Sequence, residues 1–206
     1  MLIFGRIAAV TLLALLVLTC GAQAGGDEAM VKTYEKATFA GGCFWGMEKY
    51  FSEIEGVAQS RVGYTGGKIS NPNYELVCSG RTGHAEAVEI TYDPSKISYE
   101  DLLEFFFMHH DPTTLNRQGP DVGTQYRSAI FYHGNEQAES AQKAKELLDT
   151  SGIFKSRLVT EISPAGEFYA AEDYHQKYLK KNPGGYCSIQ LQSHKIAAVL
   201  RASRQK

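Results

Sequence analysis

The chain has 206 residues, a formal net charge of −2 and 43% hydrophobic residues. These values are typical of a soluble globular protein that can bury a substantial core, and the length favours one domain over several. The balanced charge argues against the strongly basic surface of a nucleic-acid-binding protein.

The N-terminal segment has the features of a secretory signal peptide. An uncharged apolar run at 7–18 follows a single arginine, and Ala-Gln-Ala at 22–24 matches a cleavage site. The run is too short to span a bilayer, so we expect residues 1–24 to be removed and the protein to be exported, to a periplasm or beyond. Cys20 leaves a lipid anchor as an alternative, although Thr19 stands where that motif carries a smaller residue.

Cleavage there would leave three cysteines, Cys43, Cys78 and Cys187. An odd number of cysteines in an exported protein does not indicate a static disulfide framework. It indicates either one pair with a free thiol or a thiol that takes part in chemistry.

After a polar segment at 25–33, which we expect to be flexible, the periodicity alternates between strands and helices. No linker or internal repeat interrupts the pattern, so we expect one domain at 34–206. Ser98 and Asn135 are expected to cap two of the helices. The expected strands lie at 34–40, 57–64, 85–92, 125–132 and 158–162. The expected helices lie at 44–54, 99–110, 135–150 and 170–181, with a short loop and helix at 71–78 and a loop at 113–123.

The order of elements from 34 to 132 is βαββαβ, the ferredoxin-like split βαβ arrangement. We therefore expect an α+β fold, an α/β sandwich in which helices cover one face of a mixed sheet. A C-terminal loop and a basic, partly helical tail from residue 188 follow this core.

The first candidate catalytic residue is Cys43, in Gly-Gly-Cys-Phe-Trp at 41–45. It lies where the first strand gives way to the first helix, and the unpaired N–H groups and the dipole at a helix N-terminus favour a thiolate. Gly41 and Gly42 remove side chains from the approach, and Trp45, the single tryptophan, gives an apolar wall. The pattern favours a nucleophile over the alternative of a buried thiol among core aromatic residues.

The strand expected at 85–92 carries a second candidate. Glu86 shares one face with Val88 and Ile90, whereas Glu89 points to the other face. Burial disfavours an ionised carboxyl, so the pKa of Glu86 should rise and make it a proton donor near neutral pH. The alternation of faces along the strand is equally compatible with a half-exposed, inert Glu86 carboxylate at the end of the strand.

Three loop residues are further candidates. Tyr74 follows Asn-Pro-Asn in a loop, and Tyr126 is expected to open a strand after a long loop. Asp121 lies in that long loop, where the default interpretation is a turn residue that hydrogen-bonds its own backbone.

Metal and nucleotide sites have little support. The chain has no Cys-x-x-Cys or His-x-x-x-His, and adjacent His109 and His110 cannot both face one side of a helix. No glycine-rich nucleotide motif is present, so we expect neither metal nor cofactor. Cys78 and His84 do not form a ligand signature, and we interpret Cys78 as a buried structural thiol.

Cys187 lies in Asn-Pro-Gly-Gly-Tyr-Cys-Ser at 182–188, a flexible loop after the last expected helix of the core. A cysteine in a mobile segment can travel to another sulfur, as a resolving thiol must. The alternative is an unpaired surface cysteine, which is uncommon in an exported protein.

Together these residues resemble the peptide methionine sulfoxide reductases of the A class. The resemblance rests on Gly-Cys-Phe-Trp-Gly at 42–46, Gly-His-Ala-Glu-Ala-Val at 83–88, and the longer strings at 110–128 and 172–187. It covers about 34–187. The family has a ferredoxin-like α/β fold, in agreement with the order of elements above.

The resemblance implies three catalytic roles. Cys43 corresponds to the nucleophile, Glu86 to the acid that protonates the sulfoxide oxygen, and Cys187 to the resolving cysteine. The residues that it implies for substrate binding are the hydroxyls of Tyr74 and Tyr126, the carboxylate of Asp121, and the apolar wall of Phe44 and Trp45 that faces the substrate methyl group.

The resemblance further implies reduction of the S epimer of methionine sulfoxide, free or in oxidised proteins, by a sulfenic acid and a Cys43–Cys187 disulfide. An external thioredoxin-like dithiol would reduce this disulfide, and we expect a monomer that binds no nucleic acid. Some family members relay the disulfide to a further cysteine downstream, but none follows Cys187 here.

Two other interpretations stay open from the residues alone. A cysteine hydrolase or acyltransferase needs a histidine base beside Cys43, for which His84 or His175 is available. A periplasmic binding module would instead use its cysteines as a structural pair.

Overall fold

The computed structural model describes residues 33–189, 192 and 194–204. The predicted signal peptide (1–24) and nearly all of the polar segment expected to be flexible (25–33) lie outside the described residues.

The described chain forms a series of strands and helices whose order agrees closely with the sequence prediction up to residue 164. The elements are β1 (Glu35–Gly41), α1 (Phe44–Ser52), β2 (Val57–Thr65), α2 (Tyr74–Cys78), β3 (Ala85–Tyr92), α3 (Tyr99–Met108), β4 (Arg117–Gln118), β5 (Asp121–Val122), the 3-10 helix η1 (Thr124–Tyr126), β6 (Ser128–Tyr132), α4 (Asn135–Thr150), β7 (Glu161–Pro164), β8 (Tyr169–Ala170), α5 (Tyr178–Lys181) and α6 (Lys195–Ala202).

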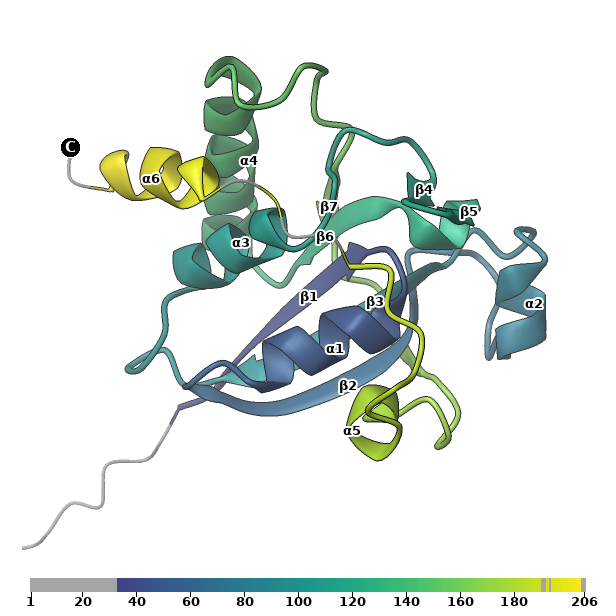
Figure 1. Ribbon diagram of the computed structural model, residues 1–206. Helices are drawn as coiled ribbons and strands as arrows, with labels where there is room; N and C mark the ends of the chain where they lie inside the picture. Colours follow the sequence, from purple (N-terminus) through teal and green to yellow (C-terminus); the bar gives the residue numbers. More distant parts are fainter. Residues whose placement is uncertain (1–32, 190–191, 193, 205–206) are drawn as a thin grey trace, which may run out of the picture. The chain divides into compact units, whose positions relative to one another are not determined.

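Six of these strands form one sheet in the order β7-β6-β1-β3-β2-β8 (Figure 1). In the four inner strands, β6-β1-β3-β2, each strand is antiparallel to its neighbours, and the order reproduces the predicted split βαβ arrangement. β7 pairs with β6 in parallel, so the sheet is mixed, as predicted. The strands β4 and β5 form a separate two-stranded sheet.

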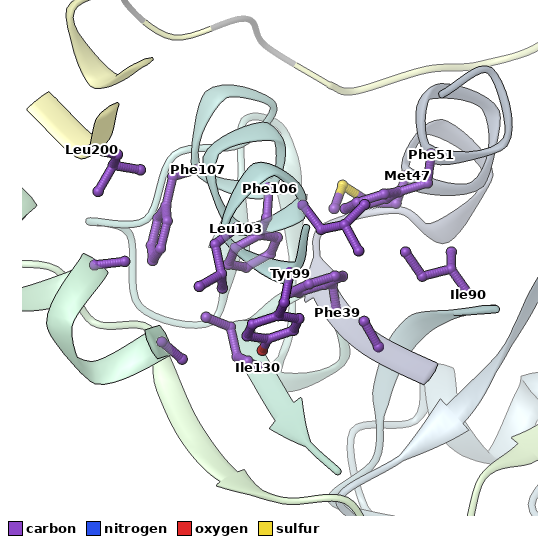
Figure 2. Packing of buried hydrophobic residues seen from close by; sticks show 14 of the residues in the cluster. Phe39, Met47, Phe51, Ile90, Tyr99, Leu103, Phe106, Phe107, Ile130 and Leu200 are labelled. Carbon is purple, nitrogen blue, oxygen red and sulfur yellow. The ribbon is translucent and has the colours of Figure 1, made fainter. Parts of the chain in front are cut away.

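The main core lies between the sheet and the three helices α1, α3 and α4 (Figure 2). Phe39 of β1 stacks on Phe51 of α1 and on Phe106 of α3, with ring centroids 5.1 Å apart in each pair. Each such ring contributes about 1.5–3 kcal/mol by its burial. The opposite face of the sheet carries a smaller cluster that includes Ala40 and Phe131, so these helices cover one face as expected.

Helix α3 begins with the predicted cap. The side chain of Ser98 accepts a hydrogen bond from the N–H of Asp101 at 3.2 Å, and the Asp101 carboxylate accepts one from the N–H of Ser98 at 3.3 Å. These two bonds form a capping box, which satisfies N–H groups that a helix start otherwise leaves unpaired. The predicted cap at Asn135 is wrong: Asn135 is the first helical residue of α4, and Gly134 takes the cap position without a side-chain hydrogen bond.

The prediction of a helix at 170–181 is wrong. Tyr169 and Ala170 form the edge strand β8 on β2, and the next N–H, that of Ala171, donates to the carbonyl of Val62 at 3.0 Å. A continuous helix is further interrupted at Lys177, which has a φ of 53°. Pairing with the sheet edge therefore outweighs the local helical pattern, and only the short α5 remains.

Two smaller differences occur near the middle of the chain. The strand predicted from residue 125 begins at Ser128, because Thr124–Tyr126 form η1, and Tyr126 therefore does not open a strand. The expected loop at 113–123 contains the hairpin of β4 and β5, in which Gln118 pairs with Asp121.

The tail is partly helical, as predicted, and α6 packs on α3 and α4. Ile196 and Leu200 are buried in the main core. Arg201 donates two hydrogen bonds to the carboxylate of Glu104 on α3, at 2.9 and 2.7 Å. Within the described part of the chain, no helix is long and apolar enough to cross a membrane.

Candidate active site

Cys43 takes the N-cap position of α1, between the end of β1 and the helix. Gly42 has a φ of 97°, and a Cβ on it would lie 2.6 Å from the side chain of Gln118. Glycine at this position thus permits both the turn and the close approach of the β4–β5 hairpin. The Cys43 side chain is only 6% exposed.

The resting state of Cys43 differs from the thiolate expected at a helix start. Burial raises the pKa of the Cys43 thiol well above its ordinary value, and Glu86, which is ionised at the alkaline pH where this thiol would titrate, raises it further. The N–H groups of Trp45 and Gly46 act in the opposite direction, but they do not compensate. The cysteine is therefore protonated before substrate enters, because desolvation outweighs the helix terminus.

Glu86 lies on the face of β3 that the helices cover, as the alternation along the strand predicted, and is 2% exposed. Its Oε2 accepts a hydrogen bond from the N–H of Phe44 at 3.1 Å, which places the carboxyl next to the residue that follows Cys43. Burial raises the pKa of Glu86 to about 8, so this carboxyl carries a proton at neutral pH. Glu89 faces the other side of the sheet, where Arg61 and Lys36 pair with it.

The two candidate tyrosines lie close enough to Glu86 for this carboxyl to affect the pKa of each hydroxyl. Burial raises the pKa of both Tyr74 and Tyr126, and Glu86, which is ionised at the alkaline pH where a tyrosine titrates, raises each further. Asp121 and Cys43 also raise the pKa of Tyr126. Both hydroxyls are therefore protonated and can donate hydrogen bonds to a bound oxygen atom.

Asp121 belongs to the β4–β5 hairpin and is more than a turn residue. Its Oδ1 accepts a hydrogen bond from the hydroxyl of Tyr186 at 2.8 Å, and the charge of its carboxylate raises the pKa of both Cys43 and Glu86. The hairpin thus brings a carboxylate from a long loop to the nucleophile, and Tyr186 ties this carboxylate to the segment that carries Cys187.

Phe44 and Trp45 have different surroundings. Phe44 is fully buried and its ring centroid lies 5.0 Å from that of His175. Trp45 is partly exposed and stacks on Tyr178, with centroids 3.8 Å apart. The indole Nε1 donates to Nδ1 of His175 at 2.9 Å, so two residues of the 175–178 segment fix the orientation of Trp45.

Both histidines proposed as a hydrolase base are engaged elsewhere. Nδ1 of His84 accepts from the N–H of Gly67 at 3.1 Å, and its Nε2 lies 2.8 Å from the carbonyl of Ile69. His175 holds the indole of Trp45. The geometry therefore does not support a cysteine hydrolase. Among the residues that the structure describes, no group of His, Cys, Asp or Glu could hold a metal ion.

The remaining two cysteines lie at the surface. A Cβ on Gly46 would be 3.1 Å from Sγ of Cys187, so the Cys187 sulfur lies over the first turn of α1, near Cys43. Cys78 is exposed, and the prediction of a buried thiol is wrong. It ends α2, a five-residue surface helix in which only Val77 is buried, and it lies close enough to Tyr74 for each to shift the pKa of the other.

The family model described as "Peptide methionine sulfoxide reductase" matches residues 35–206, most of the chain and all of the elements described above. The chain belongs to the peptide methionine sulfoxide reductase family. The MsrA reductase of Methanothermobacter thermautotrophicus is 60% identical over 156 residues, which covers 76% of this chain and 92% of that protein.

Solved structures agree with this membership. Mxr1 from Saccharomyces cerevisiae in its reduced form is 39% identical, with a TM-score of 0.73, and the match covers 78% of this reductase and 93% of Mxr1. Mxr1 in complex with Trx2 is similar at 25% identity and a TM-score of 0.53, over 78% of this chain and 91% of that one.

Sequence reasoning missed Glu172 and Tyr186, and it considered His175 only as a possible hydrolase base. Glu172 accepts hydrogen bonds from the hydroxyl of Tyr64 and the N–H of Tyr74, each at 2.9 Å. His175 orients the indole, and Tyr186 binds Asp121. All three lie in the string that supports the resemblance, but nothing in their spacing indicates which partners they contact, because those partners come from other elements.

Proposed function

We propose that this protein reduces the S epimer of methionine sulfoxide, free or in proteins, and thereby repairs oxidised proteins. The observation that carries the proposal is the placement of Cys43 beside Glu86, whose carboxyl binds the N–H directly after the cysteine. Breaking a sulfur–oxygen bond needs a soft nucleophile on sulfur and a proton for oxygen. A buried sulfur and a protonated carboxyl supply both.

In the first step, the Cys43 sulfur attacks the substrate sulfur while Glu86 gives its proton to the sulfoxide oxygen. The thiol proton of Cys43 replaces the proton that Glu86 has lost. The attack forms a bond between the two sulfur atoms. Transfer of the protonated oxygen to the Cys43 sulfur then breaks both this bond and the substrate S–O bond, so methionine leaves and Cys43 becomes a sulfenic acid. Methionine is thereby reduced and Cys43 oxidised by two electrons. Tyr74 and Tyr126 donate to the oxygen, as their protonated hydroxyls allow.

The substrate side chain binds against the apolar pair Phe44 and Trp45, which would accept its methyl group. Asp121 completes the pocket from the hairpin side, held there by Tyr186. The fixed orientation of the indole, between Tyr178 and His175, supports this role because a wall must be rigid to select a small group.

In the second step, the Cys187 sulfur attacks the sulfenic sulfur of Cys43, a disulfide forms and water leaves. The position of Sγ over the first turn of α1 supports this assignment. A thioredoxin-like protein then supplies two electrons and two protons to regenerate both thiols. The similarity to Mxr1, which has been crystallised in complex with Trx2, supports a reductant of this class.

The test is reduction of the two separated sulfoxide epimers of a blocked methionine, with dithiothreitol as the reductant. We expect wild-type protein to reduce only the S epimer. Cys43→Ser should be inactive, because a neutral hydroxyl cannot replace a soft sulfur nucleophile. Equal rates on both epimers, or substantial turnover by Cys43→Ser, would contradict the proposal.

We further propose that the protein is exported and that maturation removes residues 1–24. The apolar run at 7–18 and the Ala-Gln-Ala sequence at 22–24 support this. Intact mass of the mature protein should give a chain that begins at Gly25 without lipid. An N-terminal Cys20 that carries acyl chains would instead place the enzyme at a membrane surface.

A further inference from the structure

Glu48 is a buried carboxyl that the proposed chemistry does not use. It lies on α1, one turn after Trp45, and is 2% exposed. Burial raises its pKa, and a carboxyl in such a place destabilises the fold unless hydrogen bonds compensate. Its Oε2 accepts a hydrogen bond from the N–H of Lys177 at 2.6 Å, and its Oε1 accepts one from the Ser60 hydroxyl at 3.3 Å.

The stronger of these bonds reaches an unusual backbone position. Lys177 has a φ of 53°, in the left-handed region that residues with a Cβ rarely adopt. Such a conformation persists only where the surrounding structure determines it. The hydrogen bond from Lys177 to the Glu48 carboxyl fixes the N–H of this residue, and with it the turn that leads into α5.

The neighbours of Lys177 are the residues that hold Trp45. His175, two positions before it, accepts the indole N–H at 2.9 Å, and Tyr178, directly after it, stacks on the indole at 3.8 Å. Trp45 and Glu48 both belong to α1. Helix α1 therefore binds the turn through the carboxylate of Glu48. The residues on either side of this turn, His175 and Tyr178, in turn orient the indole of Trp45.

We propose that Glu48 is a positioning residue that fixes the Trp45 wall by anchoring the Lys177 turn. The proposal rests on the proposed role of Trp45 as a wall of the substrate pocket. It predicts that loss of the Glu48 acceptor frees the turn, weakens both contacts to the indole and lowers substrate affinity, while the reacting groups stay in place.

The chain offers a direct readout, because Trp45 is its single tryptophan. In Glu48→Met, which keeps the volume of the side chain and removes the acceptor, we expect a red-shifted emission and at least a twofold gain in acrylamide quenching. The KM for methionine sulfoxide should rise about tenfold, while sulfenic acid formation at saturating substrate changes less than threefold, since the wall contributes equally to substrate and transition state. Glu48→Gln keeps an oxygen for the Lys177 N–H and should restore wild-type values in both measurements.

A matched control is Glu89→Met, which removes a carboxyl that is 6% exposed on the opposite face of the sheet. It should lower thermal stability while emission and KM stay at the wild-type values. If Glu48→Met behaves in the same way, Glu48 only stabilises the fold and the proposal is wrong. Should Glu48→Met fail to fold, Glu48→Asp, which is one methylene shorter, should show smaller shifts in the same direction, and wild-type values there would overturn the proposal.

The emission measurement needs no turnover. If the wild-type protein does not reduce methionine sulfoxide but the Glu48→Met emission shifts as described, the proposed function fails and the anchoring of Trp45 stands. If reduction proceeds but the emission is unchanged, the function stands and the anchoring role fails.

Discussion

The buried carboxyl of Glu86 should make the stability of this protein depend on pH in a defined direction. Burial raises its pKa from 4.5 to about 8, so between these values the folded protein keeps a proton that the unfolded chain loses. A carboxyl with a raised folded pKa therefore lowers stability as pH rises through this window, and its full cost is present above pH 8. At pH 7 the cost is about 3 kcal/mol, at roughly 1.4 kcal/mol for each pH unit above 4.5.

Glu86→Gln isolates this cost, because its side chain has the same shape, is neutral at every pH and can still accept the N–H of Phe44. We expect the variant to be more stable than wild type by about 3 kcal/mol at pH 7 and equally stable near pH 4.5. In thermal unfolding, the gain at pH 7 corresponds to roughly 6–12 °C. The same variant should form the sulfenic acid about 100- to 1,000-fold more slowly, because the amide has no proton to give.

Urea unfolding of both proteins at pH 4.5, 7 and 8.5 measures the first effect, and rapid-quench single turnover measures the second. A stability difference that does not change with pH would refute the raised pKa. An unchanged single-turnover rate would remove Glu86 from the chemistry. Glu89→Gln is the control. It removes the ion pairs of Glu89 with Arg61 and Lys36 and should therefore lower stability.

Three further predictions concern Cys187, Gly46 and His110. Cys187→Ser should reduce one equivalent of substrate and stop as a Cys43 sulfenic acid when a thioredoxin-like protein is the only reductant, with partial recovery in dithiothreitol; normal cycling would refute the resolving role. Gly46→Ala places a methyl group in steric conflict with the side chain of Ile189 and 3.1 Å from Sγ of Cys187, so the segment that carries both residues must shift; disulfide formation should slow several-fold while single-turnover sulfenic acid formation does not, as thiol trapping would show. Burial lowers the pKa of His110 from 6.5 to about 4, so the unfolded chain binds a proton in this window that the folded protein does not, and stability falls as pH falls. Relative to His110→Gln, wild type should lose about 3 kcal/mol between pH 7 and pH 4 in urea unfolding, and a constant difference would refute it.

The sequence by itself determined the elements whose patterns are local. Alternation along β3 placed Glu86 on the helix-covered face, and the cap at Ser98 set the start of α3. The junction at Cys43 follows from two glycines before a helical pattern. These predictions succeed because the two-residue period of a strand, the 3.6-residue period of a helix and a helix cap all depend on residues that are close in the chain.

Tertiary structure decided what depends on contacts between distant segments. The helical pattern at 170–181 yielded to pairing with β2, and Cys78 is exposed because α2 lies at the surface. No pattern indicates that Glu48 anchors the turn 129 residues away whose neighbours orient Trp45. Nor could the helix start reveal that Cys43 is protonated at rest, because the desolvation that decides it comes from side chains that only the folded chain brings around the sulfur.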